Sequence, residues 1–150
     1  MVKRVSLMGA DCPVARALDV IGDWWSLLII RDVFDGRRRF SELQSGLGIA
    51  KGMLAARLRD LVDRGVLTTT PASDGSAYRE YVLTEKGSGL FLVIVALRQW
   101  GEDYLYGPEE RYSVLINTRT KRPVGRLMLR SDEGQRIEWH ETEVSTAEVA

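Results

Sequence analysis

The sequence predicts a mainly α-helical domain that carries one β-hairpin and is followed by a short β-rich extension. Five segments before residue 107 have the apolar content and the end signals of helices. A further segment, between the fourth and fifth of these, is rich in β-branched and aromatic residues and contains an Asp-Gly turn signal. At 150 residues the chain is long enough for one domain with an appendage. We therefore expect a domain over residues 1–106 and an extension over residues 107–150, whose role the sequence leaves open.

The first two expected helices follow each other closely. Pro13 suits the first position of a helix, and Gly22 can end it. The second helix begins after Asp23, an N-cap residue, and stops at Gly36. Because its body is strongly apolar, we expect it to be the central buried helix. Its expected core residues are Trp25, Leu28, Ile29 and Val33.

Two further helices flank the glycines of "GLG". Ser41, with Gln44 three residues later, forms a capping-box pattern that predicts the start of the third helix. The fourth helix covers about residues 50–64 and ends at Gly65. The pair predicts a helix, a short turn and a second helix. The stripe of the fourth helix that should face the core consists of Leu54, Leu58 and Leu61.

A β-hairpin is expected over residues 66–84. The stretches "VLTTT" and "YREYVLT" are rich in strand-forming residues, and "PASDGSA" between them supplies the turn. Thr84 and Glu85 then open a last helix over about residues 86–104. This helix is apolar on every side, so we expect a second subunit to cover part of it. The residues expected in that dimer interface are Leu90, Val93, Leu97 and Trp100.

The extension begins at Gly107-Pro108, a strong turn signal. Three segments after it, "RYSVLINT", "VGRLMLR" and "RIEW", have the composition of short strands. The turn signals "TKRP" and "SDEG" separate them. We expect a small β-rich appendage.

Metal binding and catalysis are not indicated. The chain has one cysteine and one histidine, Cys12 and His140, which lie far apart without the paired spacing of a zinc site. None of the recurring catalytic spacings is present, and "GLGIAKG" follows a helix instead of the strand that a phosphate loop requires. We expect no enzyme, no metal and no cofactor.

Membrane insertion and secretion are not indicated either. The N-terminal stretch lacks the apolar run of a signal peptide. The longest apolar run, "LFLVIVAL" at residues 90–97, is far shorter than the ~20 residues that span a bilayer. We expect a cytoplasmic protein with no membrane partner.

Charge is balanced over the chain but unevenly distributed. Basic and acidic residues both total 21, so net charge alone does not indicate a nucleic-acid partner. Residues 31–64 hold eight basic and five acidic residues, whereas residues 131–150 hold one basic and six acidic residues. The basic excess therefore falls on the helix pair around "GLG".

Two helices with a tight glycine break, a following hairpin and basic element ends together predict a winged helix-turn-helix. In that arrangement the second helix can lie in the DNA major groove, and the hairpin, or wing, reaches along the duplex. The alternative is that the helices only pack against each other and the arginines are solvated, because a fold does not fix a function.

Residues 12–104 resemble the HxlR family of bacterial winged helix-turn-helix transcription regulators. The resemblance rests on Cys12-Pro13, Trp25, the "RRFSEL" run, the "ML…RL…L…G" helix pattern, and Tyr81-x-Leu83-Thr84-x-x-Gly87. It implies a homodimer that uses the N-terminal and final helices as its interface. It also implies that the dimer binds operator DNA, which is double-stranded, through two recognition helices.

The candidate DNA contacts lie in the fourth helix, which the resemblance makes the recognition helix, in the arginine run before the third helix and in the wing. Arg57 and Arg59 could instead pair with Asp60 or Asp63 on the helix surface. Arg79 is a weaker candidate, because it is shifted by one residue from the basic position usual in the family, and such a shift reverses the face of a strand. The expected contacts are Arg37, Arg38, Arg39, Ser41, Lys51, Met53, Arg57, Arg59 and Arg79.

Two further features concern a signal. Cys12 lies at the start of the first helix, where the helix dipole favours a thiolate, so it is a candidate redox or electrophile sensor, although a lone cysteine can also be inert packing. Trp24 beside Trp25 departs from the family pattern, and with Trp100 these residues could line a site for a small-molecule effector or pack in the dimer interface.

The sequence therefore predicts a dimeric, sequence-specific DNA-binding regulator, a repressor relieved by a small-molecule or redox signal. The rival interpretation is a dimeric protein-interaction module that keeps the winged-helix fold without binding DNA. The neutral net charge and the acidic tail are compatible with this alternative.

Overall fold

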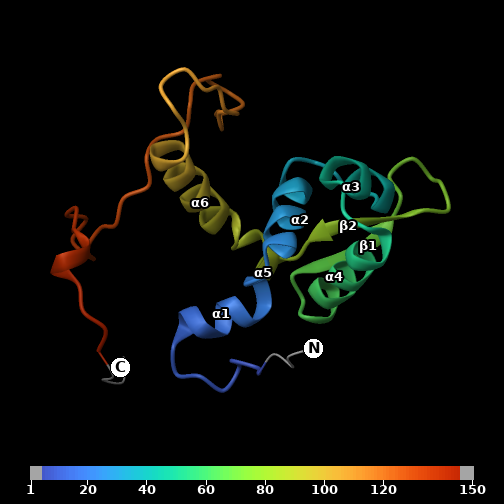
Figure 1. Cartoon of the computed structure of the whole chain (residues 1–150), viewed down its shortest axis with the longest axis horizontal. Coiled ribbons are helices and arrows are strands. Elements are labelled where there is room, and N and C mark those ends of the chain that lie inside the picture. Colours follow the sequence, from blue (N-terminus) through green and yellow to red (C-terminus); the bar gives the residue numbers. More distant parts are fainter. Residues whose placement is uncertain (1–4, 146–150) are drawn as a thin grey trace. The chain divides into compact units, whose positions relative to one another are not determined.

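The computed structural model describes residues 5–145 of the chain (Figure 1). Contacts divide the chain into two compact units, the first ending at Ile94 and the second beginning at Val95. The first unit holds the helix pair and the hairpin, and the second holds most of the last long helix and the segment after it. The division lies inside a helix, earlier than the Gly107-Pro108 turn at which the sequence suggests a boundary.

The first two helices form as expected. Helix α1 covers Pro13–Ile21 and is followed by Gly22, and helix α2 covers Trp24–Phe34. Asp23 caps α2, because its Oδ1 accepts a hydrogen bond from the Ser26 N–H at 2.9 Å. That bond satisfies one of the amide groups that a helix start leaves free.

The buried face of α2 is rotated from the expected one. Leu28 is only half-buried, so its assignment to the core is wrong, and Trp25 packs against the core while remaining partly exposed. A helix that is apolar on all sides gives no periodic signal from which to phase its buried face. The residues of α2 that are buried are Ser26, Ile29, Ile30, Asp32 and Val33.

Helix α3 covers Phe40–Leu47, with Arg39 as its N-cap residue, so it begins two residues earlier than the capping-box pattern predicted. Glu42, and not Ser41, supports its start, because the Glu42 carboxylate accepts hydrogen bonds from the backbone N–H groups of Arg38 and Arg39 at 2.8 and 3.0 Å. The expected cap at Ser41 is therefore wrong. Helix α3 ends at Gly48, whose φ of 64° lies in the left-handed region that favours glycine.

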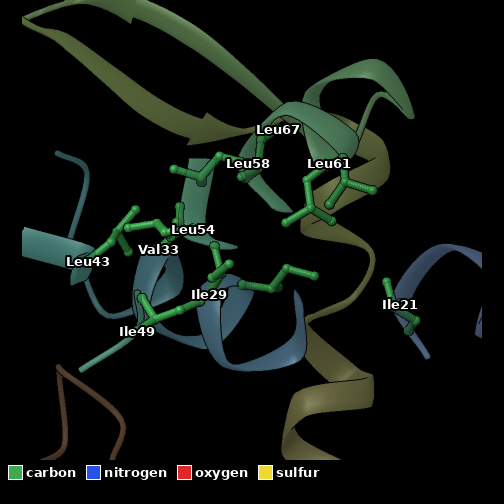
Figure 2. Close-up of a cluster of buried hydrophobic side chains, with 11 residues drawn as sticks. Ile21, Ile29, Val33, Leu43, Ile49, Leu54, Leu58, Leu61 and Leu67 are labelled. Carbon is green, nitrogen blue, oxygen red and sulfur yellow. The ribbon is translucent and has the colours of Figure 1, made fainter. Parts of the chain in front are cut away.

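Helix α4 covers Lys51–Asp63 and supplies the middle of the core. Its leucine stripe is fully buried, as the spacing predicts. Figure 2 shows this cluster, in which α4 packs on α2, α3 and the base of the hairpin. The buried residues of the cluster are Ile21, Ile29, Ile30, Val33, Leu43, Ile49, Leu54, Leu58, Leu61, Val66 and Leu67.

The hairpin consists of strands β1, Leu67–Pro71, and β2, Arg79–Leu83, paired antiparallel. The pairing runs from Leu67 opposite Leu83 to Pro71 opposite Arg79. Gly75 turns the chain with a φ of 77°, so the Asp-Gly signal is confirmed. The Tyr81 N–H donates to the Arg38 carbonyl at 2.8 Å, which joins the hairpin to the loop before α3.

The single helix expected over 86–104 is two helices, α5 over Glu85–Ser88 and α6 over Phe91–Tyr104. Thr84 opens α5, since its hydroxyl accepts from the Gly87 N–H at 3.0 Å. Two glycines in three residues, Gly87 and Gly89, weaken the helix at this point. The break lets Leu90 pack against the core.

The expected β-rich extension is wrong. Over residues 105–145, strand pairing is limited to isolated bridges between Ile116 and Pro123 and between Arg130 and Arg136, and a short 3₁₀ helix, η1, covers Trp139–Glu141. Turns form at the predicted places, but their flanks do not continue as strands. A two-stranded hairpin without a packed face is marginal in water.

A helix side chain binds the extension where a neighbouring strand would otherwise pair. The buried Gln99 amide of α6 donates to the Gly125 carbonyl at 3.0 Å and accepts from the Leu127 N–H at 2.8 Å. These two backbone groups are therefore satisfied without a ladder.

Candidate nucleic-acid interface

Helix α4 has one buried face and one open face. The leucine stripe occupies the first, and Lys51, Gly52, Ala56 and Arg59 are exposed on the other. Spacings of one, four and three residues between them place these four on the same side of the helix. Two are small and two are cationic, so the open face can approach a polyanion closely and meet it with positive charge. Met53, beside it, is 41% exposed.

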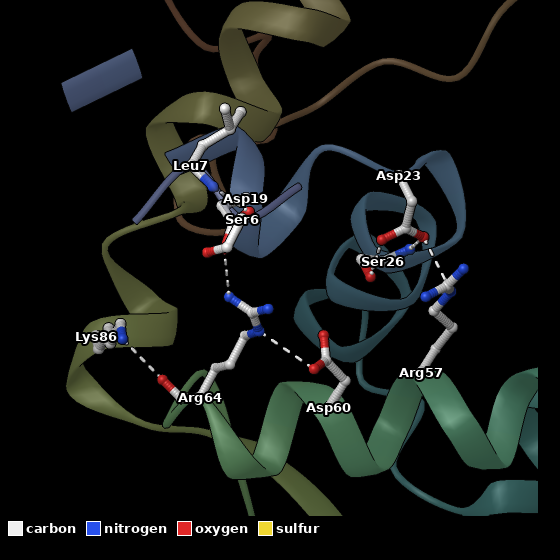
Figure 3. Close-up of polar contacts among 9 residues, drawn as sticks. All are labelled: Ser6, Leu7, Asp19, Asp23, Ser26, Arg57, Asp60, Arg64 and Lys86. Carbon is white, nitrogen blue, oxygen red and sulfur yellow. Dashed lines mark hydrogen bonds and ion pairs between the residues drawn. The ribbon is translucent and has the colours of Figure 1, made fainter. Parts of the chain in front are cut away.

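Arg57 is directed away from that face. Its Nε lies 3.3 Å from Oδ1 of Asp23, the residue that caps α2 (Figure 3). The pair connects α4 to the start of α2. Neither Asp60 nor Asp63, the partners considered from sequence, forms this ion pair with Arg57 in the described part of the chain.

Arg64, which sequence reasoning did not assign to the site, fixes the far end of α4 (Figure 3). Its guanidinium lies 3.1 Å from Asp60 and 3.2 Å from Asp19 of α1, and its carbonyl accepts from Lys86 Nζ at 2.7 Å. The Leu7 N–H and Arg64 together hold the pKa of Asp19 below its ordinary value. Helix α4 is thus tied to α1 and α5 at one end and to α2 near its middle.

Arg37 faces a buried carboxylate. Asp32 is fully buried, and its two oxygens lie 2.8 Å from the Arg31 guanidinium and 2.6 Å from Arg37 Nη1. A buried carboxylate is costly unless it is paired and hydrogen-bonded. Arg37 therefore helps hold the segment between α2 and α3, and its positive charge is partly neutralised by Asp32.

Arg38 and Ser41 are exposed at the start of α3. Among residues 5–145, the Arg38 side chain makes no ion pair. The neighbouring Glu42 carboxylate accepts from the backbone of Arg38 and Arg39, and these two N–H groups lower its pKa. The α3 start is thus well ordered, and it presents one unpaired guanidinium and one hydroxyl to solvent.

Arg39 reaches the wing. Its Nη2 lies 2.5 Å from Asp74 Oδ2 and 3.7 Å from Glu80 Oε1, and its guanidinium lies 5.8 Å from the centre of the Tyr78 ring. The hydrogen bond from Arg39 holds the pKa of Asp74 well below its ordinary value, and Asp74 raises the pKa of Arg39.

Arg79 lies on the wing face that also carries Tyr81, since alternate residues of a strand share a face. Its guanidinium donates to the hydroxyl and carbonyl of Thr69 on the partner strand at 3.1 and 3.2 Å. Thr69 and Tyr81 line a hollow with Arg59 of α4. The structure thus brings Arg79 to the wing face that is turned toward α4.

The candidate sensor and the tryptophans lie outside the helix pair. Cys12 is exposed at the N-cap of α1, where its side chain makes no capping hydrogen bond. Trp24 is 73% exposed, and its ring centre lies 5.7 Å from that of Trp25. Trp100 of α6 is also exposed, with its ring centre 5.7 Å from that of Tyr104.

The residues expected in a dimer interface divide into two sets. Leu90 packs against the core of its own chain. Val93, Leu97 and Trp100 are exposed, and with Tyr104 they form a stripe along α6 at spacings of four, three and four residues.

Within residues 5–145, no three of the cysteine, histidine and acidic side chains are grouped as a metal site would require. No helix of the same stretch is long and apolar enough to cross a membrane.

Two helices joined by a glycine turn, the second with an open cationic face and a two-stranded wing beside it, define a winged helix-turn-helix protein. A family model described as HxlR-like helix-turn-helix matches residues 20–109, and the chain belongs to this family. It is a family of transcriptional regulators and not of enzymes, which confirms the expectation that the chain is not an enzyme.

Similar proteins carry the same description. An HTH-type transcriptional regulator of Mycobacterium tuberculosis is 48% identical over 96 residues, which are 64% of this chain and 61% of the relative. The chain thus spans about three-fifths of the length of that relative.

Solved structures extend the likeness. PA1607, described as a candidate transcription factor, is 50% identical with a TM-score of 0.90 over 95% of this chain and 100% of its own. The redox regulator HypR, in its oxidised form, is 33% identical with a TM-score of 0.56 over 61% of this chain and 96% of its own.

Proposed function

We propose that this protein is a sequence-specific DNA-binding transcription regulator that acts as a homodimer in the cytoplasm. The observation that carries the proposal is the open face of α4, on which Lys51 and Arg59 flank Gly52 and Ala56. A helix with this face can enter the major groove, where small residues allow close approach and the cations meet base edges or phosphates.

The residues expected to contact DNA fall into two sets: those whose side chains face solvent, and arginines that are bound to an acidic residue of the protein. Lys51, Met53 and Arg59 of α4 face the groove, Arg38 and Ser41 meet phosphates at the α3 start, and Arg79 contacts the backbone from the wing. Arg37 and Arg57 act inside the protein, because each is held by an acidic residue, Asp32 and Asp23 respectively.

The test measures binding of the protein to the DNA upstream of its own gene over a range of salt concentrations. If Lys51 meets a phosphate, Lys51→Ala should weaken binding to all sequences and lower the salt slope by about one for each phosphate that is no longer neutralised. If Arg59 reads a base edge, Arg59→Ala should cost roughly 1–3 kcal/mol on the cognate site and little on random DNA.

Arg119→Ala is the matched control, because Arg119 is exposed in the second unit and its removal changes net charge equally. Unchanged affinity and salt slope in a folded Lys51→Ala, Arg59→Ala double variant would contradict the assignment of α4. Absence of any DNA binding by the native protein would favour the rival interpretation, a dimeric protein-interaction module.

The regulatory part of the proposal is that the protein is a repressor relieved by a redox or small-molecule signal. Two features support it: the exposed Cys12 at the start of α1, and the exposed Trp24 against Trp25. A similar protein, HypR, is described as a redox regulator. The apolar stripe on α6 supports the homodimer, because an unpaired stripe of this kind marks a protein interface.

A further inference from the structure

Arg39 joins two elements that are distant in the sequence. It is the N-cap residue of α3, and its partner Asp74 lies 35 residues later in the turn of the wing. The Arg39 side chain is 26% exposed, and its second partner, Glu80, is 6% exposed. The guanidinium is thus already held by two carboxylates, and it is largely covered by the protein.

The wing turn is organised around the same carboxylates. Glu80 Oε1 accepts from the N–H and the hydroxyl of Ser73 at 3.2 and 2.9 Å. Asp74 Oδ1 accepts from the Ser76 N–H at 2.9 Å, while its Oδ2 faces Arg39. One guanidinium therefore contacts both of the acidic groups that shape this turn.

A two-stranded hairpin is marginal by itself, so its direction depends on what holds it to the domain. Midway along β2, the Tyr81 N–H bonds to the Arg38 carbonyl. Toward its tip, Arg39 holds Asp74 and Glu80. Removal of the Arg39 guanidinium would leave the Tyr81–Arg38 bond in place and release the turn from α3.

We propose that Arg39 is a positioning residue, and that its ion pair with Asp74 holds the wing in the direction needed to meet DNA beside α4. The proposal rests on the proposed DNA-binding function. It divides the run of three arginines: Arg38 contacts phosphate, whereas Arg37 and Arg39 act through the acidic residues that they bind.

Asp74→Asn tests the proposal because simple electrostatics and positioning predict opposite results. Removal of a negative charge near a DNA-binding surface should strengthen binding if only charge matters. If the ion pair positions the wing, Asp74→Asn should weaken binding by about two- to fivefold, the range expected for a partly exposed pair. The asparagine keeps an oxygen for the Ser76 N–H, so the turn itself should persist.

Asp63→Asn is the matched control, since Asp63 is exposed at the end of α4 and forms no ion pair within residues 5–145. It should leave affinity unchanged or raise it slightly. Stronger binding by Asp74→Asn than by the native protein would overturn the proposal.

Arg39→Gln separates positioning from direct contact through the salt dependence. A positioning residue neutralises no phosphate, so affinity should fall while the salt slope stays unchanged. Arg38→Gln should lower the slope by about one per site. In an Arg39→Gln, Asp74→Asn double variant the decrease in affinity should be no larger than in Arg39→Gln alone, because that substitution already removes the pair with Asp74. A slope lowered by Arg39→Gln would assign Arg39 to the phosphate contacts instead.

Amide hydrogen exchange tests the ion pair without DNA. The N–H groups of Gly75 and Ser76 should exchange faster in Asp74→Asn and Arg39→Gln than in the native protein, while those of α4 remain protected. Unchanged exchange in the wing would overturn the proposal even if the native protein binds DNA. Faster exchange in a protein that binds no DNA would contradict only the proposed function.

Discussion

At the scale of single residues, side chains of one type have different tasks because their local partners differ. Arg38 is exposed without an ion pair among residues 5–145, Arg37 faces the buried Asp32, and Arg39 faces the wing. Because Arg37 and Arg39 are each bound to a carboxylate of the protein, the run of three arginines does not present three free charges to one ligand.

Cys12 carries the prediction that belongs to this scale. Treatment with a thiol-reactive electrophile should weaken DNA binding by the native protein, because the thiol is exposed at the start of α1. Cys12→Ser should bind DNA normally and resist the reagent. The serine hydroxyl can also cap α1, so thermal stability should be maintained or rise. Equal weakening of DNA binding in both proteins would place the effect elsewhere, and no effect in either would favour an inert cysteine.

At the scale of elements, the position of α5 depends on close packing against the hairpin. A Cβ built on Gly87 would lie 2.1 Å from the Val66 carbonyl oxygen, which is backbone and cannot move aside easily. Thr84 binds the same segment just before β1, since its hydroxyl donates to the Gly65 carbonyl at 2.5 Å. The glycine is therefore needed for α5 to reach the place from which Leu90 enters the core.

Gly87→Ala should accordingly destabilise the protein by about 1–3 kcal/mol, the usual cost of overpacking. Gly52→Ala is the control, because nothing lies within 4 Å of its Cβ position in α4. That change should be neutral or stabilise by up to about 1 kcal/mol, since alanine favours a helix more than glycine does. Chemical denaturation of both variants without DNA measures the difference. Equal stabilities would contradict the close approach of α5 to Val66.

At the scale of the whole molecule, the apolar stripe of α6 decides the expected assembly. Leu97 is 49% and Trp100 57% exposed, although the same helix packs Ile94 against the core. A helix that is apolar on several sides needs more than one partner. Two copies related by a two-fold axis would cover both stripes at once.

Leu97→Glu should therefore shift the protein from dimer to monomer at micromolar concentration and weaken operator binding, because two recognition helices would no longer be linked. Sedimentation velocity measures the first effect. Glu102→Gln, a charge change on the same helix, should leave the dimer intact. A native protein that sediments as a folded monomer would contradict the homodimer. A Leu97→Glu protein that remains dimeric would place the interface elsewhere.

Most of the elements could be predicted because their signals are local. Pro13 and Gly22 bound α1, Asp23 caps α2, and the leucine spacing of α4 fixes its buried face. The Asp-Gly turn places the hairpin. Each signal involves residues within about one helical turn or one hairpin turn of each other, so the sequence alone determines it.

The tertiary structure decided what depends on residues far apart in the chain. The rotation of α2, the start of α3 and the irregular extension follow from packing and from hydrogen bonds such as that of Gln99 to Gly125, 26 residues away. The partner of Arg39 lies 35 residues along the chain, and that of Arg64 lies 45 residues away in α1. No local pattern encodes such pairs, because charges separated in sequence meet only after the elements that carry them have packed.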